Sequence, residues 1–170
     1  MLTKMQLLNA LKLLGEKLAS EGKRGELLLM GGAAMALVHD ARDMTKDIDA
    51  LYEPKSDINR LTAEIAEEMQ LPPDWLNDSV KGFVSAEMEA REFLSFPGIQ
   101  INSISPEYLL AMKLLSARLS ETDLEDIKFL LRKLNINSPR QAYAVLENYY
   151  PDAQVLPKTM YLIEELLASN

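Results

Sequence analysis

Two aspartates, Asp47 and Asp49, stand one residue apart at the start of a run of alternating polar and apolar residues, 47–53. In a strand, residues two apart project to the same face, so this spacing presents two carboxylates side by side while Ile48 faces the core. Two carboxylates at such a short distance raise each other's pKa unless a cation lies between them. A site with oxygen ligands alone selects Mg²⁺ or Mn²⁺. The pair therefore predicts a metal site, although an ordinary solvated edge strand would show the same alternation.

Two glycines, Gly31 and Gly32, separate a short apolar run, 26–30, from an alanine-rich segment, 33–38. The apolar run is too short for a helix with its own face and predicts a buried strand, and the alanine-rich segment favours a helix. Glycines between them let the backbone approach a ligand and offer N–H groups to phosphate oxygens, although a simple turn would use the same residues. Metal–nucleotide binding is indicated by the order of these features along the chain: a strand, the two glycines, a helix, a polar loop over 39–46 and the paired aspartates.

The other elements follow from hydrophobic periodicity and from glycine and proline breaks. In the first part of the chain, the pattern predicts helices over 4–20 and from Ser56 or Asp57 to 69, a turn or short helix over 75–78, and strands over 92–96 and 99–104. In the second part, it predicts helices over 107–119, 122–134, 139–149 and 157–168, the second of these opened by a Thr122–Glu125 capping box. We therefore expect an α+β fold, with a small mixed β-sheet flanked by helices over 1–105 and a C-terminal helical bundle over 106–170.

Composition limits the chemistry that is available. The chain has 170 residues, a net charge of −8, no cysteine and one histidine, His39. Disulfides, thiol nucleophiles and multi-histidine metal sites are thereby excluded, and the acidic balance disfavours a general nucleic-acid coat. Charged residues interrupt the N-terminal segment, which lacks the apolar stretch of a signal peptide or membrane span. We expect a cytoplasmic protein without a membrane partner.

The string over 31–52, GGAAMALVHDARDMTKDIDALY, resembles the nucleotidyltransferase superfamily typified by DNA polymerase beta. The signature of that superfamily is an apolar residue, Gly-Gly or Gly-Ser, a spacer, and Asp-x-Asp, and here the spacer has fourteen residues. More specifically, the string resembles bacterial nucleotidyltransferase-like proteins akin to the abortive-infection toxins of type IV toxin–antitoxin systems. The resemblance covers roughly residues 26–135. It includes the stretch Trp75-Leu76-Asn77 and four positions of the second half, Lys113, Arg118, Asp123 and Asp126.

The resemblance implies transfer of a nucleotide monophosphate from a nucleoside triphosphate (NTP) to a hydroxyl acceptor, which could be a tRNA, a protein or a small molecule. It also implies a cognate antitoxin as a possible partner. Asp47 and Asp49 would hold the metal, and the Gly31-Gly32 backbone would position the phosphates. Arg42 and Thr45 would contact phosphates as well, although a charged loop is usually only solvated. Lys113 would neutralise phosphate charge and Asp123 would act near the site, although Lys113 could equally be an exposed helix lysine.

One position departs from the superfamily pattern. A later strand usually supplies a third acid, but the expected strand carries Gln100 and Asn102 instead. Glu87, Glu89, Glu92 and Asp123 are the candidates to replace it.

We favour Asp123 as the third acid, because on a helical wheel it falls within the apolar arc while Asp126 falls at its edge. A carboxylate on a buried face needs a partner, for which Lys113 or a metal would serve. The missing strand acid also keeps open an alternative, in which the chain is a catalytically degenerate module that binds a nucleotide or another protein.

Overall fold

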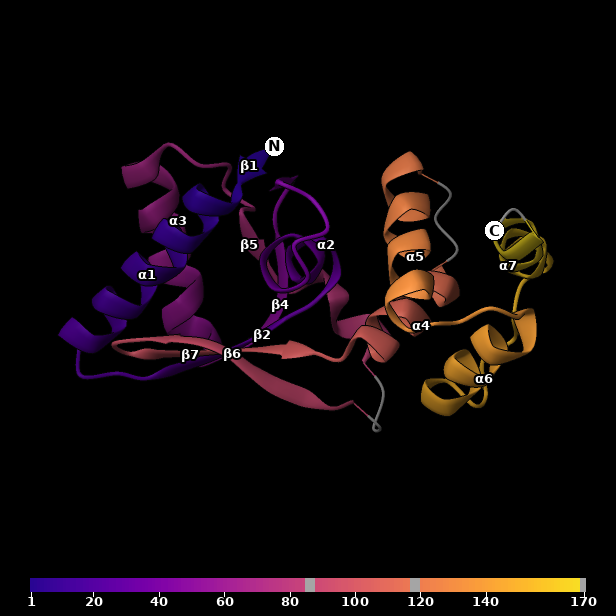
Figure 1. The fold of residues 1–170 in the computed structure, drawn as a ribbon. Coiled ribbons are helices and arrows are strands. Elements are labelled where there is room, and N and C mark those ends of the chain that lie inside the picture. Colours follow the sequence, from indigo (N-terminus) through magenta and orange to yellow (C-terminus); the bar gives the residue numbers. More distant parts are fainter. Residues whose placement is uncertain (85–87, 117–119, 169–170) are drawn as a thin grey trace. The chain divides into compact units, whose positions relative to one another are not determined.

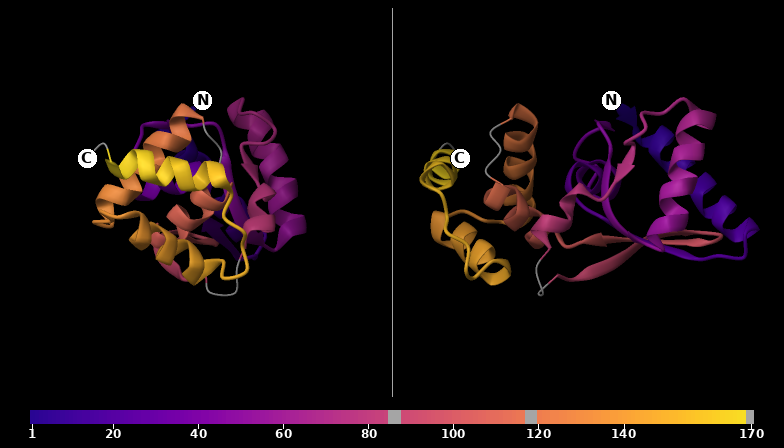
Figure 2. Two further views of the ribbon diagram at one scale, coloured as in Figure 1. Left: turned by 90° about the vertical axis from the view of Figure 1, so that its right-hand side faces the viewer. Right: turned by 180° about the vertical axis from the view of Figure 1, so that it is seen from behind.

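The computed structural model describes residues 1–84, 88–116 and 120–168. The chain divides into two compact units, one made of residues 1–82 and 90–104 and the other of residues 83–89 and 105–170. Figures 1 and 2 show the sheet with its helices in the first unit and a group of helices in the second. The expected division into domains over 1–105 and 106–170 stays a prediction.

The first unit is built on a five-stranded mixed sheet in the order β5-β4-β2-β7-β6. Its strands are β2 (Gly25–Leu29), β4 (Ile48–Glu53), β5 (Leu76–Asn77), β6 (Ala90–Phe96) and β7 (Ile99–Ile104). Strand β2 pairs antiparallel with β4 and parallel with β7, β5 runs parallel to β4, and β6 and β7 form an antiparallel hairpin. The predicted α+β fold with a small mixed sheet is confirmed.

Helices α1 (Lys4–Ser20) and α3 (Lys55–Met69) pack against each other on the same side of the sheet (Figure 1). Leu7, Leu11, Leu14 and Leu18 of α1 are all buried, as the three- and four-residue spacing predicts. On β2, Leu27 and Leu29 are buried while Glu26 is exposed, so the strand's alternation separates its two faces. The core of this unit therefore lies between the helices and one face of the sheet.

The second unit contains helices α4 (Pro106–Ser116), α5 (Glu121–Lys133), α6 (Pro139–Tyr149) and α7 (Pro157–Ala168). Helix α4 packs against α5 and α6, and α6 packs against α7, so the predicted C-terminal helices are confirmed. The predicted end of the first of them at residue 119 lies outside the described residues, as does Arg118. No helix of the described residues is long and apolar enough to cross a membrane.

Tertiary contacts override two local expectations. The segment predicted as a turn or short helix over 75–78 contains β5, because the backbone N–H of Ile48 bonds to the carbonyl of Trp75 at 2.7 Å and draws the chain alongside β4. Trp75 itself is fully buried and donates its indole N–H to the Thr62 carbonyl at 3.1 Å. The predicted loop over 39–46 contains β3 (Met44–Thr45), which pairs antiparallel with β1 (Leu2–Thr3). Two-residue strands have no sequence period of their own, so only the partner strand reveals them.

Three predicted element starts are also wrong by a few residues. Helix α5 begins at Glu121, and the side chain of Ser120 caps it by accepting from the N–H of Asp123, so the predicted Thr122 capping box is wrong. Helix α3 begins at Lys55, after Pro54, and has no side-chain cap. Strand β4 begins at Ile48, so Asp47 lies immediately before the strand and not within it. Element boundaries are the least certain part of a pattern-based prediction.

Candidate functional site

The diglycine and the paired aspartates meet at one end of the sheet. Strands β2 and β4 are antiparallel neighbours, so the end of β2 lies beside the beginning of β4. The N–H of Met30, directly before the glycines, donates to the carbonyl of Asp49 at 2.9 Å. The diglycine and the aspartate pair, which are 15 to 18 residues apart in the sequence, are thus fixed next to each other by backbone pairing.

At both glycine positions other side chains lie so close to the backbone that a Cβ atom would not fit. Gly31 has φ of +52°, and a Cβ placed there would lie 2.9 Å from the carboxylate Oδ2 of Asp49. A Cβ on Gly32 would lie 2.6 Å from the Arg42 guanidinium and 2.7 Å from the Thr45 hydroxyl. The glycines therefore bring the backbone into contact with three of the predicted site residues.

The segment after the glycines differs from the ordinary α-helix predicted for 33–38. One short turn, α2 (Gly31–Ala33), continues into a π-helix, η1 (Ala34–Val38). Single π-helical turns are rare in proteins overall, but those that occur are often found at functional sites. This π-helical turn follows closely after Gly31, the glycine that lies next to Asp49.

The two carboxylates are held by neutral donors. The side-chain amide of Asn77, at the end of β5, donates to Asp47 Oδ2 at 3.3 Å, and the Ser79 hydroxyl donates to Asp49 Oδ1 at 3.2 Å. Among the described residues, the one cation within 4.0 Å of the pair makes a weak contact, because Lys46 Nζ lies 4.0 Å from Asp47 Oδ2 and its side chain is 76% exposed, against 20% for Asp47. Burial and, next to it, the charge of Asp49 raise the pKa of Asp47. The pair is therefore a concentration of negative charge that a divalent cation would relieve.

The donor set fits an oxygen-preferring cation such as Mg²⁺ or Mn²⁺, with Asp47 and Asp49 as its carboxylate ligands. Within residues 1–84, 88–116 and 120–168, no group of three or more histidine or acidic residues gathers to hold a metal. Of the candidates for a third acid, Glu89 is exposed, Glu92 is an exposed residue of β6, and Glu87 lies outside the described residues. The structure thus provides two acids for this site and does not bring a described third one to them.

A second acidic cluster lies between α4 and α5 in the other unit. Lys113 Nζ contacts Asp123 Oδ1 at 2.9 Å and Asp126 Oδ2 at 2.7 Å. The expectation that Lys113 would be the partner of Asp123 is confirmed, but the predicted order of burial is wrong. The side chain of Asp126 is 4% exposed and that of Asp123 is 23% exposed. The apolar arc of the helical wheel takes only the apolar side chains of this one helix into account. In the structure Lys113 of α4 contacts both acids, and Asp126 is the more buried of the two.

Comparison with known proteins identifies the family. The model of a family described as nucleotidyltransferase of unknown function (DUF6036) matches residues 5–161. The chain belongs to this family. Neither the curated proteins nor the solved structures that we compared with the chain gave a match.

Membership in this family confirms the predicted resemblance to nucleotidyltransferases. It implies an NTP as substrate and leaves the acceptor unnamed. The family match spans both units, including the α4 and α5 segments that hold Lys113 and Asp123.

The sequence includes Asn77 in the family resemblance but does not predict that Asn77 and Ser79 lie beside the carboxylates. A local signal was present, because Asn followed two positions later by Ser is typical of a turn in which the side chain accepts from the backbone. The N–H of Ser79 does donate to Asn77 Oδ1, at 3.1 Å. What the sequence lacked was the register that pairs Asn77 with Asp49.

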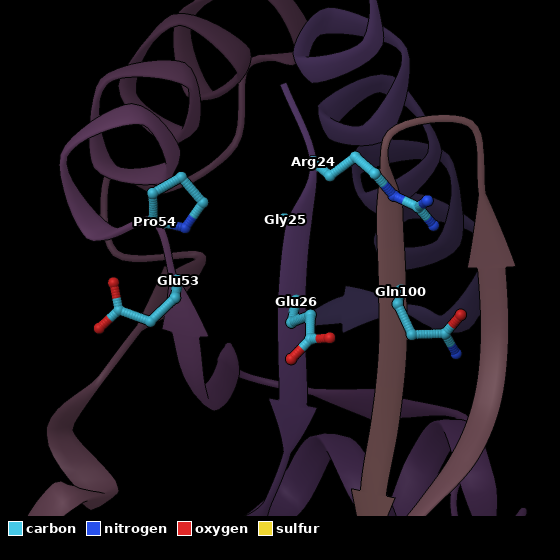
Figure 3. Close-up of a pocket in the computed structure, with 6 residues that line it drawn as sticks. All are labelled: Arg24, Gly25, Glu26, Glu53, Pro54 and Gln100. Atoms are coloured by element: carbon cyan, nitrogen blue, oxygen red, sulfur yellow. The ribbon is translucent and has the colours of Figure 1, made fainter. Parts of the chain in front are cut away.

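A cavity lies at the other end of the same strands. It measures about 530 Å³ and is lined by Arg24, Gly25, Glu26, Glu53, Pro54 and Gln100. Figure 3 shows Glu53, Glu26 and Gln100 on three neighbouring strands, where they are paired in register. Because Glu53 ends β4 while Asp49 is near its beginning, this cavity is separate from the candidate site.

Proposed function

We propose that the chain is a metal-dependent nucleotidyltransferase that transfers a nucleotide monophosphate from an NTP to a hydroxyl acceptor. The observation that carries the proposal is the close approach of the diglycine turn to the aspartate pair, such that a Cβ placed on Gly31 would lie 2.9 Å from Asp49 Oδ2. A phosphate-binding backbone and a cation-binding pair side by side are the two parts that NTP chemistry requires. Family membership gives the reaction class independently.

In this proposal each residue of the site has a role. The backbone N–H groups of Gly31 and Gly32 donate to phosphate oxygens, and Arg42 and Thr45, which border Gly32, bind the same phosphates. Asp47 and Asp49 hold one or two Mg²⁺ or Mn²⁺ ions. When bound, such ions neutralise the negative charge of the phosphates and of the attacking and leaving oxygens.

The transfer step makes one bond and breaks one. The acceptor's hydroxyl oxygen bonds to the α-phosphorus, and the bond between the α-phosphorus and the oxygen bridging to the β-phosphate breaks. Pyrophosphate leaves with that electron pair, and the hydroxyl proton passes to solvent. The site residues contribute by aligning the phosphates and stabilising charge, which supplies most of the catalysis in reactions of this type.

Lys113 and Asp123 enter the proposal through the sequence resemblance. Lys113 would neutralise phosphate charge as a point-charge ligand, although its ammonium is already in contact with two carboxylates. We expect Lys113→Met and Asp123→Asn each to lower pyrophosphate release. The measurement requires variants whose unfolding midpoints show that they are folded.

The acceptor and the toxin role are proposed on the same resemblance. We propose a hydroxyl group of a tRNA or of a protein as the acceptor to test first. Because the chain is acidic, with a net charge of −8, its proposed antitoxin would be basic. Co-purification of the tagged chain with the product of a neighbouring gene tests the partner. A chain that purifies alone under the same conditions contradicts it.

The activity is tested with α-³²P-labelled NTPs, Mg²⁺ and a panel of RNA and protein acceptors, with pyrophosphate release as the readout. We expect transfer by the wild type and none by Asp47→Asn or Asp49→Asn. The matched control is the pair Glu26→Gln and Glu53→Gln, which removes two charges from the same two strands at the cavity end. Equal transfer by the aspartate variants and the wild type would rule out the proposed site.

A second candidate function is a nucleotide-binding module without turnover. It is favoured by the observation that no third acid among the described residues joins Asp47 and Asp49. This alternative predicts metal-dependent NTP binding that the aspartate variants lose, with no pyrophosphate release in the presence of any acceptor.

A further inference from the structure

Two side chains at the end of β5 and just after it lie beside the aspartate pair. Asn77 donates its amide N–H to Asp47 Oδ2 at 3.3 Å, and the Ser79 hydroxyl lies 3.2 Å from Asp49 Oδ1 and also contacts Asn77 Oδ1. Each carboxylate therefore has one oxygen within hydrogen-bond distance of a neutral donor from the same turn, and the single hydroxyl proton of Ser79 has two acceptors. Asn77 belongs to the Trp75-Leu76-Asn77 part of the family resemblance, whereas Ser79 belongs to no motif quoted above.

The direction of the Asn77 amide is fixed by its surroundings. The backbone N–H of Ser79 is a donor only and bonds to Asn77 Oδ1 at 3.1 Å. The other end of the amide, Nδ2, also donates to the Asp74 carbonyl, at 3.4 Å. Because a carbonyl accepts only, the N–H end must face Asp74 and Asp47.

The turn itself is anchored to the strand that carries Asp49. Strand β5 pairs with β4 in a register that sets Leu76 beside Ile48 and Asn77 beside Asp49. The buried Trp75 precedes β5 and fixes the strand from the core side. Asn77 is thus held by backbone pairing, and Ser79, the first residue of the short 3-10 helix η2 (Ser79–Phe83), is tied to Asn77 by its own backbone N–H.

Neutral donors have a specific advantage over a cationic partner. A lysine or arginine in contact with the pair would compete with a metal for the carboxylates, whereas an amide and a hydroxyl orient the oxygens and leave the negative charge in place. The lysine nearest to Asp47 in the described part of the chain, Lys46, is 4.0 Å away and exposed.

We propose that Asn77 and Ser79 are positioning residues that pre-orient Asp47 and Asp49 for a divalent cation, so that two acids suffice where relatives of the superfamily use three. The inference rests on the proposed function, because it assumes that the pair binds a cation. Hydrogen-bond partners of metal ligands typically change metal affinity by about 10–100-fold when removed.

The test is Mn²⁺ binding to the full chain, measured by electron paramagnetic resonance of the free ion without nucleotide. We expect Asn77→Ala and Ser79→Ala each to weaken Mn²⁺ binding about tenfold. Ser79→Thr keeps the hydroxyl and retains the wild-type affinity.

Matched controls come from the same unit. Asn59→Ala removes an exposed asparagine that accepts from the Tyr52 hydroxyl, and Ser20→Ala removes an exposed serine that donates to the Lys17 carbonyl. Both should bind Mn²⁺ as the wild type does. A purely structural role for Asn77 and Ser79 would lower the thermal midpoint of the metal-free protein and leave Mn²⁺ affinity unchanged.

The outcomes separate this inference from the proposed function. If the wild type binds Mn²⁺ through Asp47 and Asp49 while Asn77→Ala and Ser79→Ala bind it equally well, only the positioning role is overturned. If the wild type shows no binding that depends on the aspartates, both proposals are overturned. If Asn77→Ala fails to fold, Ser79→Ala and its rescue by Ser79→Thr decide, because Ser79 is exposed.

Discussion

The two units contain acidic clusters that are built in opposite ways. In the helical unit, Asp123 and Asp126 both contact the ammonium of Lys113, at 2.9 and 2.7 Å, and Lys113 and Asp126 are buried. In the sheet unit, Asp47 and Asp49 have an amide, a hydroxyl and one exposed lysine at 4.0 Å as their contacts. The first cluster has its cation within the fold, whereas the second, in our proposal, binds one from solution.

The difference predicts opposite consequences when an acid is removed. A buried ion pair that loses one partner leaves an uncompensated charge in a region of low dielectric constant. A pair of like charges that loses one member is relieved of repulsion. Stability measurements on single variants can therefore tell a structural acid from one that is held ready for a ligand.

The largest expected change in stability is that of Asp126→Ala. Removing this buried carboxylate, with Asp123 left as the one acid in contact with Lys113, should lower the free energy of unfolding by about 1.5–3 kcal/mol. Urea denaturation followed by circular dichroism measures it. Asp152→Ala, at an exposed position of the same unit, is the control and should change the value by less than about 0.5 kcal/mol. A small effect of Asp126→Ala would show that the contact with Lys113 is not a structural ion pair.

An intermediate effect is expected from Gly31→Ala. Its φ of +52° makes any side chain cost about 1–2 kcal/mol, and the new Cβ would also displace Asp49. Gly22 has φ of +68° with no atom within 4 Å, so Gly22→Ala carries the same backbone cost without touching the site. Both variants should lose similar stability, but only Gly31→Ala should weaken metal-dependent NTP binding. Equal binding by the two variants would mean that the glycine is needed for the turn alone.

A smaller effect of opposite sign is expected from Asp47→Asn. Without metal at neutral pH, the loss of one charge from the half-buried pair should raise the free energy of unfolding by on the order of 1 kcal/mol. Thermal unfolding with a chelator present measures it, and Asp43→Asn, whose side chain is fully exposed, is the control. A destabilised Asp47→Asn variant would place this pair in the same structural class as the Lys113 cluster.

The pH dependence should follow from the same residue and is the smallest effect. Burial and the charge of Asp49 raise the pKa of Asp47, so the folded chain holds this proton more tightly than the unfolded chain does. The resulting stabilisation is present at low pH and is lost as pH rises through the raised pKa. The stability gap between the wild type and Asp47→Asn should therefore close as pH falls from about 7 toward the ordinary aspartate range. A gap that widens toward acid would contradict the assigned cause.

The sequence was informative where the local pattern and the final contact coincide. The alternation over 47–53 predicts β4, which begins one residue later, and the two glycines predict a turn without side chains, which the structure uses for a close approach to Asp49. Strand β5 and the burial of Asp126 were not predictable in this way, because each depends on a partner from another element. Asn77 and Ser79 show the same limit, since their turn is readable from the sequence but the strand register that faces it toward the carboxylates is not.

The central claim is that Asp47 and Asp49 form a metal-dependent nucleotide site. Isothermal titration of the chain with ATP, CTP, GTP and UTP, each with and without Mg²⁺, tests it most directly. We expect binding of at least one triphosphate that requires Mg²⁺, is lost in the Asp47→Ala, Asp49→Ala double variant, and is retained when Glu26 and Glu53 are changed to glutamine. Binding that survives in the aspartate double variant, or no binding of any triphosphate by the wild type, would contradict the claim.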